Sequence, residues 1–174
     1  MQTNAIATAN CLIDIAESDG KKLKQFGLIK RVYIVHGFAL ILFENKGKGA
    51  LDPRFDTVEA WKHGPVIPSV YHSFKHFGDS PVEKSFIVED VDKNGSLKYV
   101  TPMLSDPDIV EACRIVWKRY INYNDFEIIR LLHREGTPWS LCYREGENRQ
   151  IPDIYTKAYY RKLITRLYRE QFAI

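Results

Sequence analysis

The sequence predicts a mainly α fold, in which residues 1–174 form one compact domain, a bundle of six or seven helices with a minor β-hairpin or extended excursion near residues 85–100. Apolar residues recur at spacings of three and four through most of the chain, which is the period of one face of an α-helix. Polar capping residues stand directly before prolines, which is typical of helix starts. The length of 174 residues is enough for one well-buried domain and short for two.

Two helices are expected at the start of the chain, over residues 4–18 and from about 25 to 44. The first carries an apolar stripe at helical spacing, and Gly20 marks its end. The second is apolar on most of its sides, which is typical of a central helix in a bundle. A buried strand is the weaker alternative, because strands rarely exceed about ten residues. His36 in this segment is expected to be a hydrogen-bonded core residue rather than a ligand.

A sharply shaped connection is expected over residues 60–68, and the rest of the chain is organised around it. Pro65 has no N–H to donate and disfavours the α conformation at Gly64, so this segment is not the middle of a helix. It is either a tight loop that covers the core with Trp61 or such a loop that also forms part of a partner surface. A helix follows over residues 68–77, since proline suits the first helical turn.

The chain after Pro81 has a different composition. Residues 85–89 and 97–100 are rich in residue types that favour strands, and residues 92–95 between them suit a tight turn. These features predict a small β-hairpin, or an irregular excursion with an extended start. Residues 90–94 resemble the beginning of a calcium-binding loop, but the closing glutamate is missing, so no calcium site is expected.

Four further helices are expected to begin near Asp106, Asn124, Thr137 and Pro152. We interpret Asp106 as a cap and Asp108 as a first-turn acid, so this pair of carboxylates is not considered catalytic. The buried stripe of the last helix is expected to contain Tyr155, Tyr159, Leu163 and Leu167.

Composition and charge narrow the class of protein. Apolar content of 45% and aromatic content of 13% fit a packed globule, and a net charge of +3 is too small to indicate nucleic-acid or membrane binding. The three cysteines are odd in number and widely spaced, so we expect reduced thiols. No signal peptide is evident, and the most apolar run, residues 32–43, is too short to cross a bilayer. We therefore expect a soluble cytoplasmic protein without a membrane partner.

The motifs predict no enzyme, cofactor or metal site. The chain has no P-loop, no dinucleotide-binding glycine motif, no GxSxG and no HExxH. His72 and His76 stand one helical turn apart, but no third metal ligand accompanies them. Cys142 follows His133 closely, yet it falls on the apolar side of a short helix. The rival hypothesis is a hydrolase that uses His63 or His133.

Nucleic-acid binding is the other alternative. The last helix combines tyrosines with basic residues, which can stack on bases and contact phosphates. The residues that would carry this function are Arg161, Lys162 and Arg166. These charges alternate with the expected buried stripe, as on any solvated helix, and no helix-turn-helix module accompanies them. Nucleic acid is therefore not the expected partner.

Two motifs stand in order along the chain. Residues 59–71 read Glu-Ala-Trp-Lys-His-Gly-Pro-Val-Ile-Pro-Ser-Val-Tyr, and residues 131–139 read Leu-Leu-His-Arg-Glu-Gly-Thr-Pro-Trp. Ile151 and a tyrosine pair at 159–160 follow. This order resembles the Panacea domain, also called the SocA-like antitoxin or phage-associated GepA-like domain. The resemblance covers nearly the whole chain, although residues 28–33 lack the glutamine of the family pattern.

The resemblance implies an antitoxin of a toxin–antitoxin system, with phage or prophage association. Such a protein neutralises its cognate toxin, encoded by the adjacent gene, through direct protein contact. One characterised type delivers its toxin to a Clp-type protease, and some members add a DNA-binding module, for which we expect no room in this chain. The family is not known for catalysis or for a bound cofactor.

The physical hypothesis is a helical scaffold whose aromatic surface docks the toxin and covers its active site. The residues expected to bind the partner are Trp61, His63, Pro65, Tyr71, Trp139 and Tyr160. The alternative is that Trp61 and Trp139 are core residues that hold the neighbouring proline loops. In that case their loss would unfold the protein and would resemble a loss of function.

Overall fold

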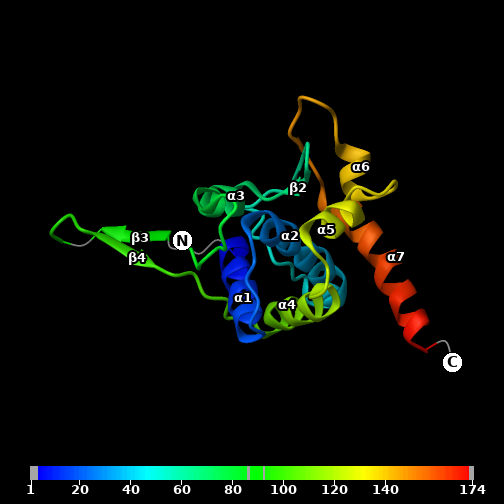
Figure 1. Ribbon diagram of the computed structural model, residues 1–174, viewed down its shortest axis with the longest axis horizontal. Helices are drawn as coiled ribbons and strands as arrows, with labels where there is room; N and C mark the ends of the chain where they lie inside the picture. The colour runs from blue at the N-terminus through cyan, green and yellow to red at the C-terminus, as the bar shows by residue number, and fades with distance from the viewer. Residues whose placement is uncertain (1–3, 86, 92, 173–174) are drawn as a thin grey trace.

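The computed structural model describes residues 4–172 except 86 and 92, with side chains for residues 5–171 except 86–92. Within that part, the order of the elements confirms the mainly α class (Figure 1). The seven helices are α1 (Asn4–Ser18), α2 (Gln25–Leu42), α3 (Pro68–Phe74), α4 (Pro107–Tyr120), α5 (Asp125–Leu132), α6 (Pro138–Cys142) and α7 (Asp153–Phe172). The short 3-10 turns are η1 (Glu44–Lys46) and η2 (Lys75–Phe77). The strands are β1 (Glu59–Trp61), β2 (Gly64–Val66), β3 (Ile87–Val91), β4 (Leu97–Val100) and β5 (Arg149–Gln150).

Helix α2 lies at the centre of the fold, with α1, α4, α5 and α7 packed around it (Figure 1). Every residue from Gly27 to Leu40 is buried, which confirms the prediction of a central helix. Gln25–Leu42 is long and apolar enough to cross a membrane, but 78% of it is buried inside the fold, as is typical of a core helix. The helix ends at Leu42, slightly before the expected limit, and η1 follows.

Two polar side chains connect α2 to its neighbours. His36 is buried, and its Nε2 lies 3.0 Å from Oδ1 of Asp153 at the start of α7. This contact confirms that His36 is a hydrogen-bonded core residue, and it lowers the pKa of Asp153. Arg31 donates to the Tyr123 carbonyl oxygen at 2.7 Å and pairs with Asp125 at 3.5 Å, so it links α2 to the start of α5.

The segment expected as a sharply shaped connection contains two short paired strands, which were not predicted. β1 and β2 pair antiparallel, with Ala60 opposite Pro65 and Trp61 opposite Gly64, and β5 pairs with the other side of β1. The order β2-β1-β5 places Pro65 on an edge strand, where proline is tolerated because one side of the strand has no ladder to complete. The helix expected over residues 68–77 is present as α3 followed by η2.

The hairpin expected near residues 85–100 is present as β3 and β4, which pair antiparallel with an irregularity between Val88 and Asp90. It projects from the helical body as a separate arm in Figure 1. Gly95 of the expected turn has a φ of 81°, which suits glycine, and Asp92 lies outside the described residues.

The predicted helix starts at Asp106, Asn124 and Thr137 are confirmed. Each of these side chains accepts a hydrogen bond from a backbone N–H in the first helical turn. α4 was expected to run to about Tyr123 and ends at Tyr120, shortly before Asn124 caps the next helix.

Helix α7 corrects one prediction about the core. The stripe expected to be buried is wrong by one position, since Tyr155 is 45% exposed. The buried residues are Thr156, Tyr160 and Ile164. Two adjacent stripes of this helix both have helical spacing, so the sequence does not determine which of them faces the core. The rotation is set by α2, where Gly37 leaves the space that the Tyr160 ring occupies.

Candidate functional site

The two sequence motifs meet at the β1–β2 hairpin. The indole Nε1 of Trp139 donates a hydrogen bond of 2.8 Å to the carbonyl oxygen of Trp61, which joins residues 78 positions apart. β1 ends at Trp61, and the Thr137 cap fixes Trp139 in the first turn of α6. The hairpin shaped by the first motif is therefore held against the helix that begins in the second.

Further aromatic rings pack against both residues of this hydrogen bond, Trp139 and Trp61. The imidazole of His133 stacks on Trp139 with centroids 3.8 Å apart and planes at 3°, and Tyr143 stacks on the same residue at 4.7 Å. Trp61 packs edge-on against Tyr71 at 5.0 Å. Aromatic pairs of this kind contribute roughly 0.5–1.5 kcal/mol each beyond the area that they bury. The hairpin cluster, as we call it below, consists of Trp61, His63, Tyr71, His133 and Trp139.

Gly64 allows the two motifs to approach each other. Its φ is +101°, a conformation that residues with a side chain rarely adopt. A Cβ atom here would lie 3.1 Å from Nε2 of His133 and 3.4 Å from Cε of Lys30. The hairpin turn therefore needs glycine both for its backbone conformation and for the close approach of His133.

A buried lysine lies beneath the hairpin. Lys30 of α2 is 1% exposed, and its Nζ donates a hydrogen bond of 2.8 Å to the carbonyl oxygen of Pro65. The same nitrogen lies 5.0 Å from the centroid of the Phe26 ring. Desolvation by burial lowers the pKa of Lys30 to about 7. The amine is therefore divided between its charged and neutral forms near pH 7.

Burial also lowers the pKa of His133, and the nearby Lys30 charge lowers it further. The Nε2 atom of His133 is buried and has no hydrogen-bond partner of good geometry in the part of the chain that the structure describes. The lowered pKa favours the neutral imidazole, which stacks on Trp139. The role of His133 in this arrangement is to pack the two motifs together.

Four of the six expected partner-binding residues reach the surface of the hairpin cluster. Trp61, Tyr71 and Trp139 are half-buried, so each keeps an accessible edge. His63 is exposed on the hairpin turn, with its ring centroid 6.4 Å from that of Phe26. These positions suit contact with a partner, and they also explain how the same aromatic residues stabilise the hairpin.

The other two expected residues do not reach the surface. Pro65 is buried, and its carbonyl oxygen is occupied by Lys30. Tyr160 is 1% exposed and packs against Tyr33 and Phe38 at centroid distances of 6.0 and 5.7 Å. We therefore correct the expectation for Tyr160, because the rotation of α7 turns it into the core and away from the hairpin cluster.

Sequence reasoning missed Lys30 and Phe26 as members of this region. The signal was the position of Lys30 in a helix predicted to be buried on most sides, where an amine needs an acceptor. Lys30 lies in the stretch of residues 28–33 that was compared with the family pattern, but that comparison gave it no role, and Phe26 lies outside the quoted motifs. The acceptor is a backbone carbonyl in a hairpin that the sequence did not reveal.

The sequence offers His72, His76 and Cys142 as candidates for metal binding or catalysis. His72 belongs to α3 and His76 to the following 3-10 turn, and among the residues whose placement is described no three metal-ligating side chains come together. Burial raises the pKa of Cys142, which opposes formation of a reactive thiolate.

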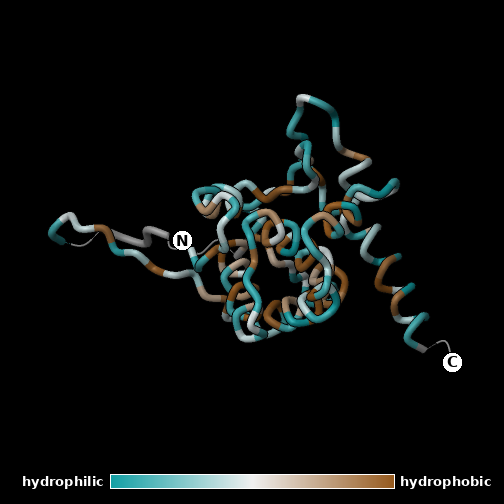
Figure 2. Tube along the Cα trace, in the orientation of Figure 1, coloured by the Kyte–Doolittle hydropathy of each residue, from teal (hydrophilic) through white to brown (hydrophobic). Residues whose placement is uncertain are grey.

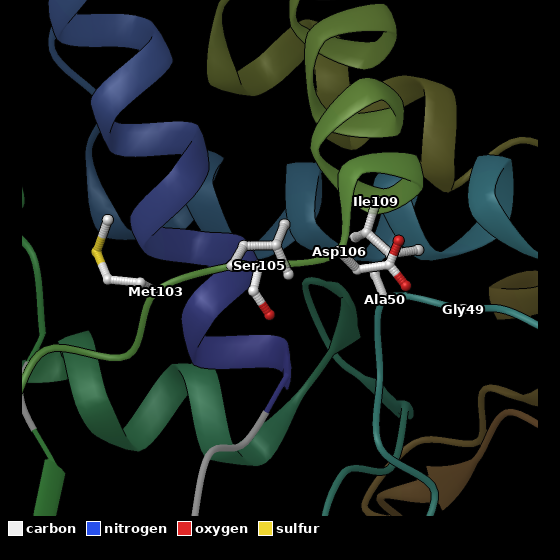
Figure 3. Close-up of a pocket in the computed structure, with 7 residues that line it drawn as sticks. Gly49, Ala50, Met103, Ser105, Asp106 and Ile109 are labelled. Carbon is white, nitrogen blue, oxygen red and sulfur yellow. The ribbon is translucent and has the colours of Figure 1, made fainter.

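A small cavity lies beside the start of α4 (Figure 3). Its volume is about 60 Å³, and Figure 3 shows Asp106, the cap of α4, and Ile109 of α4 beside Gly49 and Ala50. Asp106 and Asp108 both pair with Lys48, and hydrogen bonds to lysine lower the pKa of each carboxyl group. Asp106 caps α4, and both carboxylates form ion pairs with lysine, which confirms their structural interpretation.

The basic residues of α7 that the sequence offers for nucleic-acid contact are exposed. Arg161 pairs with Glu44 at 2.6 Å, and Arg166 lies 3.7 Å from Glu170. Lys162 and Arg166 line a surface pocket together with Arg134 from the α5–α6 connection. Two of the three residues considered for nucleic-acid contact are thus engaged with carboxylates.

A comparison with known proteins identifies a family whose matched region contains both motifs. The family model described as "Antitoxin SocA-like, Panacea domain" matches residues 28–140, a range that contains Lys30, Gly64, His133 and Trp139. The chain is 29% identical over 138 residues to Antitoxin SocA of Caulobacter vibrioides (strain NA1000 / CB15N), a match that covers 79% of this chain and 69% of that protein. No solved structure gives a significant match. The chain belongs to the family of SocA-like antitoxins with a Panacea domain.

Proposed function

We propose that this chain is the antitoxin of a toxin–antitoxin system and that it neutralises the toxin encoded by the adjacent gene through direct binding in the cytoplasm. The match of residues 28–140 to the family of SocA-like antitoxins carries the proposal. The role is non-enzymatic, since binding alone suffices to cover a toxin surface. No cofactor is required for it.

The hairpin cluster is the surface that we assign to the toxin. It offers the half-buried edges of Trp61, Tyr71 and Trp139 around the exposed turn at His63. Phe26 beside His63 is 36% exposed and Leu141 in α6 is 54% exposed, so apolar surface continues around the cluster. Aromatic residues at the centre of such a patch are the residue types that most often dominate interface energies.

The experiment is co-expression of this chain with the product of its neighbouring gene, scored by growth and by co-purification. We expect the neighbouring product alone to arrest growth and co-expression to restore growth with a stable complex. A neighbour without toxicity, or a toxic neighbour that this chain does not restrain, would contradict the proposal.

A matched pair of variants tests whether the toxin binds at the hairpin cluster. His63→Ala removes an exposed ring from the hairpin turn, and His76→Ala removes an exposed ring from η2, away from the cluster. We expect the first variant to weaken the complex and the second to leave it unchanged, with both proteins folded by circular dichroism. Equal binding by the two variants would remove His63 from the interface.

Delivery of the toxin to a Clp-type protease is the alternative mode of neutralisation. It predicts that growth is restored only in cells with the protease and that the toxin half-life shortens when this chain is present. Toxin that accumulates in an intact complex, with or without the protease, would support neutralisation by binding alone.

A further inference from the structure

The apolar stripe of α7 extends beyond the helices that it packs on. Thr156, Tyr160 and Ile164 are buried, whereas Leu167 is half-buried and Tyr168 is 57% exposed. Figure 1 shows the C-terminal part of α7 extending away from the helical body, and Figure 2 shows that hydrophobic residues continue along it. The second half of this helix therefore presents an apolar stripe without a complete covering from the described chain.

An open groove runs beside this part of α7, between α7, α4 and the end of α2. Its volume is about 510 Å³, which is sufficient for several apolar side chains. The apolar residues of this α4–α7 groove are Phe38, Leu42, Ile115, Ile164, Leu167 and Tyr168. Because they come from three helices whose stripes have helical spacing, the groove has the form into which a further helix packs.

The rim of the α4–α7 groove is basic. Lys118 and Arg119, in the last turn of α4, line it and are exposed, and neither forms an ion pair with a carboxylate in the part of the chain that is described. The carboxylate of Glu170 on α7 is directed to Arg166, outside the groove residues. Two exposed cations above an apolar floor favour a partner segment with acidic residues beside apolar ones.

We propose that the α4–α7 groove binds an acidic amphipathic helix of the toxin, an inference that rests on the proposed antitoxin function. The helix places apolar side chains on Ile115, Ile164 and Leu167, and its acidic residues meet Lys118 and Arg119. A nucleic acid can stack on Tyr168, but it would place polar phosphates against the aliphatic side chains of Ile115 and Leu167. It is therefore less suited to this site than an amphipathic helix. A second copy of this chain is disfavoured because it would bring two basic rims together.

The test uses the full chain and the purified product of the neighbouring gene, with affinity measured by calorimetry at low and high salt. Lys118→Glu with Arg119→Glu reverses the rim, and Tyr168→Asp places a charge on the exposed part of the floor. We expect each variant to weaken binding by about tenfold or more. For the rim variant, most of the loss should appear at low salt, because high salt already screens exposed charges.

The matched control is Lys21→Glu with Lys22→Glu, which makes the same change in net charge at two exposed lysines between α1 and α2. It should change the affinity less than twofold, and all variants should keep the wild-type melting temperature. If folded groove variants bind as wild type while His63→Ala binds weakly, the groove inference fails and the antitoxin function stands. If the wild type does not bind the neighbouring product at all, both proposals fail.

The same variants identify a different occupant. A wild-type dimer that Tyr168→Asp converts to a monomer would assign the groove to a second copy of this chain. Binding of a short DNA duplex that is lost in the rim variant would assign it to nucleic acid. Either result would overturn the proposal.

Discussion

The hairpin cluster and the α4–α7 groove are both candidate binding surfaces, yet they are built in opposite ways. In the hairpin cluster, His133 stacks on Trp139, which also donates a hydrogen bond to the Trp61 carbonyl oxygen. Tyr71 packs edge-on against Trp61. In the groove, the apolar residues of α7 pass from buried Ile164 through half-buried Leu167 to exposed Tyr168. The family motifs therefore mark a surface that also joins two parts of the fold, whereas we expect the exposed residues of the groove to contribute little to stability.

The two regions also differ in the burial of their charged residues. Lys30 below the hairpin is desolvated, and its pKa is lowered to about 7. Lys118 and Arg119 at the groove remain exposed to water. A charge change at the hairpin therefore affects the free energy of unfolding, while a charge change at the groove affects chiefly what binds there.

The largest effect on stability is expected for Trp139→Ala. It removes the stacking with His133 and Tyr143 and the hydrogen bond to the Trp61 carbonyl oxygen, so the free energy of unfolding should fall by about 3 kcal/mol in urea denaturation. Trp139→Phe keeps a stacking ring and should lose about 1 kcal/mol. A folded Trp139→Ala protein of wild-type stability would contradict the structural role and make Trp139 a contact residue alone.

The second prediction concerns pH, which should change the stability through the buried Lys30 and not through the exposed Lys118. The pKa of Lys30 is lowered from 10.5 to about 7 in the folded protein, so between these values the unfolded state binds more protons and stability rises with pH. From pH 7 to pH 9 the wild type should gain about 2 kcal/mol relative to Lys30→Met. The measurement is urea denaturation of both proteins at the two pH values.

The variant Lys118→Met supplies the control for the pH experiment. Its lysine is exposed, so its stability should follow that of the wild type at both pH values. Parallel pH curves for the wild type and Lys30→Met would show that Lys30 is not desolvated in the folded protein.

A smaller loss is expected for Gly64→Ala. Its φ of +101° and the approach of Nε2 of His133 both oppose a Cβ atom, and together they should cost about 2 kcal/mol in the free energy of unfolding. Gly136→Ala is the matched control, since its φ is +79° and nothing lies within 4 Å of the added atom. The excess loss at Gly64 should shrink in a His133→Ala background, and equal losses in both backgrounds would exclude the steric contact.

Much of the fold could be predicted from local signals. Helical spacing and caps such as Asp106 and Thr137 act within a few residues, so the sequence alone located the helices. The β1–β2 hairpin was not predicted, because its short strands contain Pro65 and owe their pairing to β5 and to α2 below. The rotation of α7 was also missed, since it depends on Gly37 in a helix far away in the sequence.

The candidate site was predicted only in part for the same reason. Trp61, His63, Tyr71 and Trp139 belong to motifs that can be read along the chain, and the structure places them together. Tyr160 belongs to the closing part of the family pattern, yet its contacts with Tyr33 and Phe38 place it in the core. The position of a motif residue along the chain does not state which way its side chain faces.

The smallest effect on stability is expected for Tyr168→Ala, and it tests the separation of the two regions most directly. Tyr168 is 57% exposed, so its loss should change the free energy of unfolding by less than about 0.5 kcal/mol. Tyr71→Ala, at a half-buried tyrosine packed on Trp61, should cost more. If both variants are measured by urea denaturation and by toxin affinity, Tyr168→Ala should lose affinity alone, whereas Tyr71→Ala should lose both. A Tyr168→Ala protein that is clearly destabilised would show that the end of α7 belongs to the cooperative core, and the groove would then cease to be a surface independent of folding.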